Sequence, residues 1–234
     1  MTLTDDGSTG AVTFVDSPAP ELYGSLLHSA RATGRCPVRV RRSDLKHSFG
    51  AVPDPAVIDA LDGREVLADW WRGPCRPDCP CGVPLPETIP QARIVDSYPD
   101  LSRRAATLEE AAAYARFLQP GELAVVAAHR PADTPAVLGW PGAGNYVHED
   151  LASMSAVLRY WESRWGALVV SLSRSRMTLT VANPPTTDEE CVQAAGEHIA
   201  FCPDQQDPQN GDFYSLERYG HMIRGARAWG FWWD

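Results

Sequence analysis

One amphipathic helix followed by two apolar runs constrains this sequence more than any other feature. Its apolar residues recur at alternating steps of three and four, the spacing of one continuous helical stripe: Leu151, Met154, Leu158, Trp161 and Trp165. Gly166 follows directly and is typical of a helix end. The runs 167–172 and 177–182, separated by a polar Ser-Arg-Ser turn, predict a β-hairpin. Such a unit favours helices packed against a mostly antiparallel sheet.

Further elements are predicted on both sides of this unit. Thr187 and Glu190 form a capping box for a helix that runs to Cys202, where Pro203 ends it. The other predicted elements are helices at 21–32, 56–61, 64–71, 111–118 and 216–226, strands at 37–41 and 123–128, and a closing strand at the aromatic terminus. The sequence therefore predicts an α+β fold with a mixed, mostly antiparallel sheet flanked by helices, and α/β is the second choice.

The length of 234 residues suits one domain or two closely joined lobes, and two closely packed lobes are expected. Residues 1–18 are short, polar runs and predict a flexible tail. An N-terminal lobe is expected over 19–130, and its segment 73–90 contains too many prolines for a helix or a central strand. That segment is predicted to be a Pro/Cys-rich loop, and a C-terminal domain is expected over 131–234.

Charge and targeting signals narrow the classes of function. The net charge is −9, which opposes binding to a phosphate backbone, so no nucleic acid partner is expected. The N-terminus lacks a signal-peptide pattern, and no stretch has the roughly 20 apolar residues of a membrane span. A cytoplasmic protein without a membrane partner is expected, and its six cysteines should be thiols or metal ligands.

The tightest group of reactive residue types gives the catalytic candidates: Glu197, His198, Cys202 and Asp204. His198 and Cys202 are one helical turn apart, and a carboxylate could orient the imidazole for nucleophilic chemistry. However, Cys191, Ala195, His198 and Cys202 also follow the spacing of a buried stripe. Small cysteines in such a stripe are usually core residues, so the structural interpretation is preferred over the catalytic one.

Two sets of residues could hold a metal. Cys75, Cys79 and Cys81 place three thiols within seven positions of a proline-rich loop, although the second pair of ligands typical of zinc knuckles is missing. His198 and Cys202, with Cys191, are the other candidate set. No cofactor is expected otherwise, and zinc is the possibility left open.

Aromatic residues and glycines of the C-terminal half define a candidate ligand-binding cleft. Glycines near Trp140 could present backbone amides to an anion, but more often they let the chain turn tightly. Tryptophans dominate both binding grooves and cores. We expect Arg164 to pair with the terminal Asp234. The residues assigned to ligand binding are Trp140, Gly142, Asn145, Trp161, Arg164, Trp232 and Asp234.

Several of these motifs together resemble an uncharacterised family, the domain of unknown function 4253, which is common in actinobacteria. The resembling stretches are Leu138-Gly-Trp140 with Gly142 and Asn145-Tyr146, Val157 to Arg164, Pro184-Pro185-Thr-Thr, Glu197-His198 with Phe201 to Asp204, and Phe231 to Asp234. The close resemblance covers about residues 131–234, and a looser one extends upstream through Thr33 to Pro37 and Glu65 to Trp71. The resemblance implies no particular reaction.

These features favour a non-catalytic binding or regulatory protein, including the immunity type, which recognises a protein or a small ligand. The binding region would be the cleft between Trp140, Gly142 and Asn145 and the helix that carries Glu197 and His198. Two alternatives stay open. One is a hydrolase or transferase that uses the 197–204 group. The other is a zinc-supported scaffold built by the 75–81 cysteines.

Overall fold

The strands of the protein form one sheet. The computed structural model describes residues 3–4, 12–16, 18–19, 21–45, 52–72, 122–143, 150–206 and 216–233. Within these ranges a seven-stranded sheet has the order β1-β2-β4-β3-β5-β6-β7. The strands are Leu3–Thr4 (β1), Val12–Val15 (β2), Cys36–Val40 (β3), Glu122–Val126 (β4), Ala167–Leu172 (β5), Arg176–Val181 (β6) and Ala228–Trp232 (β7).

The pairing of the strands confirms the predicted fold class. β3 and β5 run parallel, whereas the other neighbouring pairs among the described strands are antiparallel. The helices are Leu22–Thr33 (α1), Pro55–Asp59 (α2), Gly63–Arg72 (α3), Thr134–Val137 (α6), Leu151–Trp165 (α7), Asp188–Phe201 (α8) and Leu216–Ile223 (α9), with short 3₁₀ helices at Arg42–Leu45 (η1), Pro131–Asp133 (η2) and Pro203–Gln206 (η4). The protein is therefore α+β, with a mixed, mostly antiparallel sheet.

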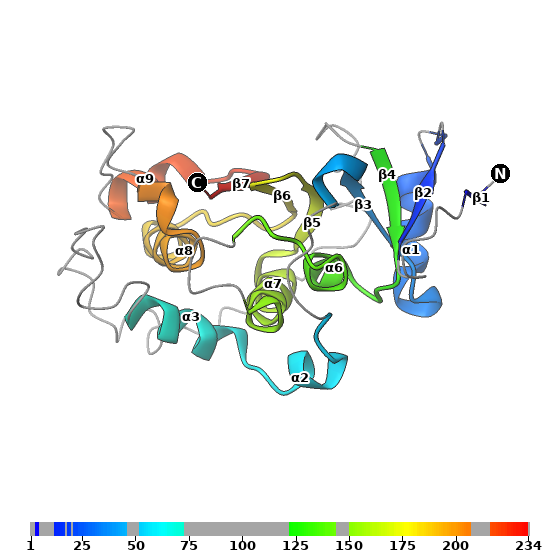
Figure 1. The fold of residues 1–234 in the computed structure, drawn as a ribbon. Helices are drawn as coiled ribbons and strands as arrows, with labels where there is room; N and C mark the ends of the chain where they lie inside the picture. Colours follow the sequence, from blue (N-terminus) through cyan, green and yellow to red (C-terminus); the bar gives the residue numbers. More distant parts are fainter. Residues whose placement is uncertain are drawn as a thin grey trace.

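Helices cover both faces of the sheet. In Figure 1, α6, α7 and α8 lie along one face, and α2 and α3 form a further layer on the far side of α7. β4 shows how this arrangement follows from the sequence, because successive side chains of a strand point to opposite faces. Ala124 and Val126 join the core formed with α7 and α8. Leu123 and Val125 instead pack with Leu27 of α1 on the other face.

Helix α7 has the ends and the buried stripe that its sequence predicts. Asp150 caps it, since one carboxylate oxygen accepts hydrogen bonds from the backbone N–H groups of Ala152 (2.9 Å) and Ser153 (3.3 Å). Gly166 ends it in the left-handed conformation, with φ of 59°. The five apolar residues of the stripe are all buried, so the prediction of a core-facing helix is confirmed.

The elements after α7 also agree with their sequence signals. β5 and β6 form the predicted hairpin. At the start of α8, Thr187 and Glu190 make both hydrogen bonds of the capping box, and the helix ends at Phe201 before Pro203. The predicted closing strand is β7, which lies at one edge of the sheet beside β6. The final helix is shorter than predicted: it ends at Ile223 rather than at Ala226.

For Leu3–Thr4 and Val12–Val15, the structure corrects the expectation of a flexible tail over residues 1–18. Val12–Val15 pairs along its whole length with β4, and Leu3–Thr4 pairs with β2. Phe14 and Val15 are buried, each on a different face of the sheet. A run of four residues is too short for its alternation to be recognised, and the nearby prolines resemble the punctuation of a tail. Pairing with a distant strand decides its conformation.

The expected lobes 19–130 and 131–234 contribute strands to the same sheet, and the pairing of β3 with β5 joins them. The predicted loop at 73–90 and the predicted helix at 111–118 lie outside the described residues. The described helices include none with both the length and the apolar character that crossing a membrane requires.

Candidate functional site

Glu197 is the buried centre of the predicted catalytic group. Its side chain extends from α8 toward α7, where Trp161 and Trp165 lie one helical turn apart. The indole N–H groups of Trp161 and Trp165 lie 2.8 and 3.5 Å from Oε2, and the Tyr160 hydroxyl donates to Oε1 at 3.2 Å. Burial raises the pKa of the Glu197 carboxyl well above its usual range, and the more distant Arg64 opposes this effect. The Glu197 carboxyl, which accepts these bonds, links the two helices.

His198 lies inside an aromatic cage. The centroid of its ring is 4.4 Å from that of Trp229 and 4.9 Å from that of Phe231, both on β7. Trp161 of α7 and Tyr219 of α9 complete the cage, and the Tyr219 hydroxyl lies 3.2 Å from Nδ1. Among the described residues, Nε2 has no hydrogen-bond partner. Burial lowers the pKa of His198 to about 3, so the imidazole is neutral at physiological pH.

Cys202 and Asp204 do not complete a reactive group with His198. The Cys202 thiol is buried and donates a hydrogen bond to the Trp232 carbonyl oxygen at 3.0 Å. Burial raises the pKa of this thiol well above its usual range, which disfavours the thiolate needed for nucleophilic attack. Asp204 lies in η4 and is partly exposed. This geometry favours the interpretation of Glu197, His198 and Cys202 as interior residues.

Of the two candidate metal-binding sets, one lies among the described residues and the other does not. Cys191 is buried at 2% exposure on α8, and no metal-binding arrangement of three or more His, Cys, Asp or Glu residues is found in the described part of the chain. The 75–81 cysteines lie outside the described residues, so the zinc hypothesis for that loop stays a hypothesis.

Trp140 and Gly142 form a closed turn. The Trp140 indole N–H donates to the Ser173 carbonyl oxygen at 2.6 Å, and its ring packs edge-on against Trp233. A Cβ atom added at Gly142 would lie 1.9 Å from Cζ2 of Trp140. The glycine therefore permits the tight approach beside Trp140 that its sequence context suggests. Asn145 lies outside the described residues.

The remaining residues assigned to ligand binding are dispersed. Trp161 is fully buried, whereas Trp232 and Arg164 are partly exposed. The Arg164 guanidinium lies 4.6 Å from the ring centroid of Trp165, a cation–π distance. Asp234, the expected partner of Arg164, lies outside the described residues. The structure thus brings Trp161, Glu197 and His198 together, and Trp140 belongs to the same core cluster, where it packs against Trp233.

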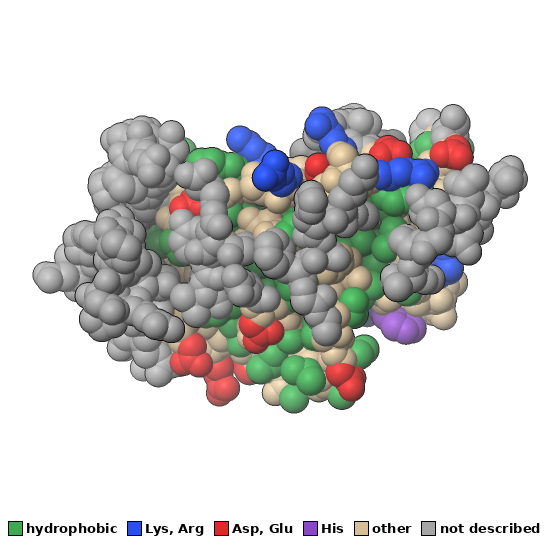
Figure 2. Space-filling view, viewed as in Figure 1, with side chains coloured by type: hydrophobic (Ala, Val, Ile, Leu, Met, Phe, Trp, Pro, Cys, Tyr) green, Lys and Arg blue, Asp and Glu red, His purple; other side chains and the backbone are tan. Residues whose placement is uncertain are grey.

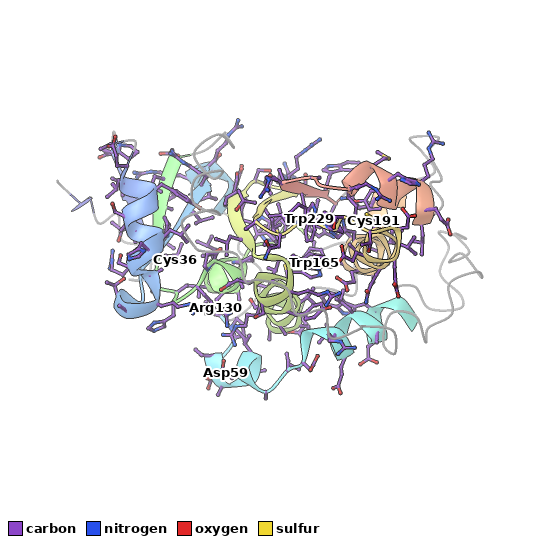
Figure 3. All side chains as sticks on the ribbon, turned by 180° about the vertical axis from the view of Figure 1, so that it is seen from behind. Cys36, Asp59, Arg130, Trp165, Cys191 and Trp229 are labelled. Atoms are coloured by element: carbon purple, nitrogen blue, oxygen red, sulfur yellow. The ribbon has the colours of Figure 1, made fainter. Side chains whose placement is uncertain are left out.

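An ion-pair network on the other side of α7 is not evident from the sequence. Arg159 donates two hydrogen bonds to Asp133 of η2, at 2.7 and 2.9 Å, and a third to Asp59 of α2. Arg130 makes a paired contact with Glu162. Figure 3 labels Asp59 and Arg130 on this side of the molecule. The helical spacing marks 159 and 162 as polar positions of α7, but it does not identify their partners.

An exposed apolar surface around α2 is also not evident from the sequence. The large hydrophobic residues with the greatest exposure include Val52 at 54%, Val57 at 51% and Leu61 at 36%. We call the exposed residues of this region the α2 surface: Val52, Pro55, Ala56, Val57, Ala60 and Leu61. Figure 2 shows hydrophobic side chains at the lower edge of the molecule, over α2, with acidic side chains beside them. The many small or proline residues of 52–61 give no strong signal in a sequence.

Contacts on either side hold the α2 surface in place. Ile58 is buried against the core, and Asp59 pairs with Arg159 of α7. Beyond Leu61, Gly63 begins α3 so close to α7 that an added Cβ would lie 2.4 Å from the Ala156 carbonyl oxygen. Because these anchors flank Val57 and Leu61, the exposed side chains are presented on a fixed backbone.

Comparisons with known proteins give one family. The family model described as Domain of unknown function (DUF4253) matches residues 122–234, from the first residue of β4 to the end of the chain. No curated protein and no solved structure matches the chain. The matched range contains Glu197 and His198, whereas the α2 surface lies before it.

Proposed function

We propose that this chain, whose residues 122–234 form a domain of the DUF4253 family, is a non-catalytic protein that recognises another protein through the α2 surface. The observation that carries the proposal is the exposure of Val52, Val57 and Leu61 within ten residues of one another. Single exposed apolar residues are common on protein surfaces, but a contiguous group is typical of an interaction site.

The chemistry of the buried group supports the non-catalytic class. A general base must reach its substrate and bind a proton near neutral pH. His198 is enclosed by aromatic rings, and its pKa is lowered to about 3 by burial. A nucleophilic cysteine needs an accessible thiolate, whereas the Cys202 thiol is buried and its pKa is raised. These residues support a core that holds α7, α8 and β7 together.

The fixed backbone of α2 supports recognition. A binding segment that is already ordered loses less conformational entropy when it meets its partner. The ion pair of Asp59 with Arg159 and the close contact of Gly63 with α7 supply that order. The α2 surface consists of six exposed residues, fewer than the roughly 20 to 30 on each side of a standard interface, so the proposed complex is of the weak, regulated kind rather than an obligate dimer. A regulatory or an immunity-type role would use such a complex.

Site-specific photo-crosslinking tests this proposal. The variant Val57→p-benzoylphenylalanine places a reactive group on the α2 surface, and it should crosslink to a defined protein in cells that produce the natural chain. The matched control is Met222→p-benzoylphenylalanine, because Met222 is exposed to a similar extent, 57%, but lies on α9. We expect the crosslinked product only from position 57.

A second variant separates specific contact from proximity. Leu61→Asp should remove the crosslink from position 57, because a charge at this apolar position disfavours burial against a partner. The folded state of this variant is checked by its circular dichroism. Crosslinking to the same proteins from positions 57 and 222, or a product unaffected by Leu61→Asp, would contradict recognition through the α2 surface.

We propose further that the protein acts in the cytoplasm of an actinobacterium and has no nucleic acid, membrane or cofactor partner. The support for this is the net charge of −9 and the free thiols of Cys36, Cys191 and Cys202, which suit a reducing compartment. Zinc at Cys75, Cys79 and Cys81 is tested by native mass spectrometry of protein purified without chelator. A mass increase by one zinc ion would support the scaffold hypothesis.

A further inference from the structure

We infer that the partner of the α2 surface presents a positively charged amphipathic helix of one or two turns. This inference rests on the proposed function and adds the chemistry of the partner. Two properties of the surface carry it: the apolar side chains at its centre and the acidic side chains around it.

The charge around the α2 surface is strongly one-sided. Residues 52–70 contain five acidic side chains and one basic side chain, Arg64. All five acidic side chains are exposed; Asp59 pairs with Arg159, and Asp54, Asp62 and Glu65 flank the residues of the α2 surface in the sequence. Figure 2 shows the acidic side chains beside the hydrophobic ones at the lower edge of this face, whereas its basic side chains gather toward the upper edge. A partner with Lys or Arg beside its apolar residues complements this arrangement.

The same charges disfavour two other occupants. In a two-fold symmetric dimer the α2 surfaces of both copies would meet, and their carboxylates would face like charges. The anionic surface of a bilayer would also repel them. The length of the surface limits the partner further, since the five residues of α2 span about 7.5 Å at 1.5 Å per residue. A short amphipathic helix, with apolar residues on one face and basic residues flanking them, fits both limits.

Two of the carboxylates that flank the α2 surface have a local role that permits a clean test. Asp54 caps α2 by accepting from the Ala56 N–H at 2.9 Å, and Asp62 accepts from the N–H groups of Arg64 and Glu65 at the start of α3. Asparagine caps helices as well as aspartate does. The variant Asp54→Asn/Asp62→Asn/Glu65→Gln therefore removes three negative charges and keeps both caps. We call it the charge-neutral variant, because the three substituted side chains are uncharged.

The test measures binding of two fluorescent peptides to the full chain by anisotropy. One peptide is an amphipathic helix of leucine and lysine, and the other has glutamate in place of every lysine. We expect the lysine peptide to bind about tenfold more tightly at low ionic strength, because three favourable surface pairs together supply about that factor. High ionic strength should reduce this preference, since salt screens exposed charges.

Variants assign the binding to the α2 surface. The charge-neutral variant should lose the tenfold preference, whereas the control Glu21→Gln/Glu189→Gln, at exposed positions elsewhere, should keep it. The variant Val57→Ser/Leu61→Ser should weaken the binding of the lysine peptide about tenfold. Binding of the lysine peptide that survives Val57→Ser/Leu61→Ser is attraction to the acidic protein in general, and it would overturn the inference.

The inference and the proposed function fail in different ways. If the photo-crosslink from position 57 forms equally well in the charge-neutral variant, and both peptides bind equally, the basic partner is excluded while recognition through α2 stands. If position 57 gives no specific crosslink, the proposed function itself fails. Loss of the natural crosslink in the charge-neutral variant, with normal folding, supports both.

Discussion

Burial acts in opposite directions on the neighbouring residues Glu197 and His198. It raises the pKa of the Glu197 carboxyl well above its usual range and lowers the pKa of the His198 imidazole to about 3, so burial favours the neutral form of both side chains. In the unfolded chain the carboxyl ionises above about pH 4.5, and the imidazole is protonated below about pH 6.5. As pH rises between these values, the Glu197 contribution to stability falls while the His198 contribution increases.

The variant Glu197→Gln should separate these two effects. A neutral amide removes the proton that Glu197 releases on unfolding. The free energy of unfolding of the variant minus that of the wild type should therefore increase by about 1.4 kcal/mol per pH unit above about pH 4.5. The increase should stop where the pH reaches the pKa of the carboxyl in the folded protein. Urea unfolding of both proteins between about pH 5 and pH 7 measures this slope. A difference that does not change with pH would mean that Glu197 is ionised in the folded protein.

The buried cysteines give a second prediction at the scale of residues. Cys36, Cys191 and Cys202 are buried, and burial raises the pKa of the Cys36 and Cys202 thiols. Iodoacetamide should label the peptides that contain them only after unfolding, because the thiolate is the reactive form. Peptide mapping by mass spectrometry follows each cysteine separately. Rapid labelling of Cys202 in the folded protein would favour the hydrolase or transferase alternative.

At the scale of elements, close backbone contacts place the helices around α7. Its N-cap and its C-terminal glycine determine where it begins and ends. The positions of the neighbouring helices instead depend on how closely their backbones can approach α7. Gly63, the first residue of α3, lies against the backbone of Ala156 and the side chain of Tyr160. A glycine at that position lets α3 approach α7 more closely than any side chain would.

The variant Gly63→Ala should therefore destabilise the protein by about 1 to 3 kcal/mol, the usual cost of overpacking. Its added Cβ would lie 2.4 Å from a carbonyl oxygen of the α7 backbone, which has little freedom to move. Gly24→Ala is the matched control, since a Cβ at this position in α1 meets nothing within 4 Å. The control should stabilise by up to about 1 kcal/mol through helix propensity. Thermal unfolding measures both, and equal effects would contradict the close contact.

At the scale of the whole molecule, the Arg159 network connects segments that are distant in the sequence. Arg159 of α7 pairs with Asp133, which is 26 residues away, and with Asp59, which is 100 residues away. The side chains of Arg159 and Asp133 are only 18% and 11% exposed. An ion pair at this depth is costly to break on one side, because the remaining charge stays desolvated.

Arg159→Met should therefore lower the free energy of unfolding by about 3 kcal/mol. Arg42→Met is the control, because Arg42 and Glu122 form a pair with 35% and 50% exposure, and loss of an exposed pair costs less than about 1 kcal/mol. Urea unfolding at one pH compares the two variants. Equal losses would show that the Arg159 network contributes no more than a surface pair.

The sequence by itself determined the local features of this protein. The α7 stripe, the capping box at Thr187, the β5–β6 hairpin and the family motifs of the C-terminal half depend on residues within a few positions of one another. Tertiary structure decided the partners of Arg159, the pairing of Val12–Val15 with β4, the burial of His198 and the exposure of Val57. These depend on segments that meet only in the folded chain, because pairing and burial are set by the surroundings that the whole fold provides.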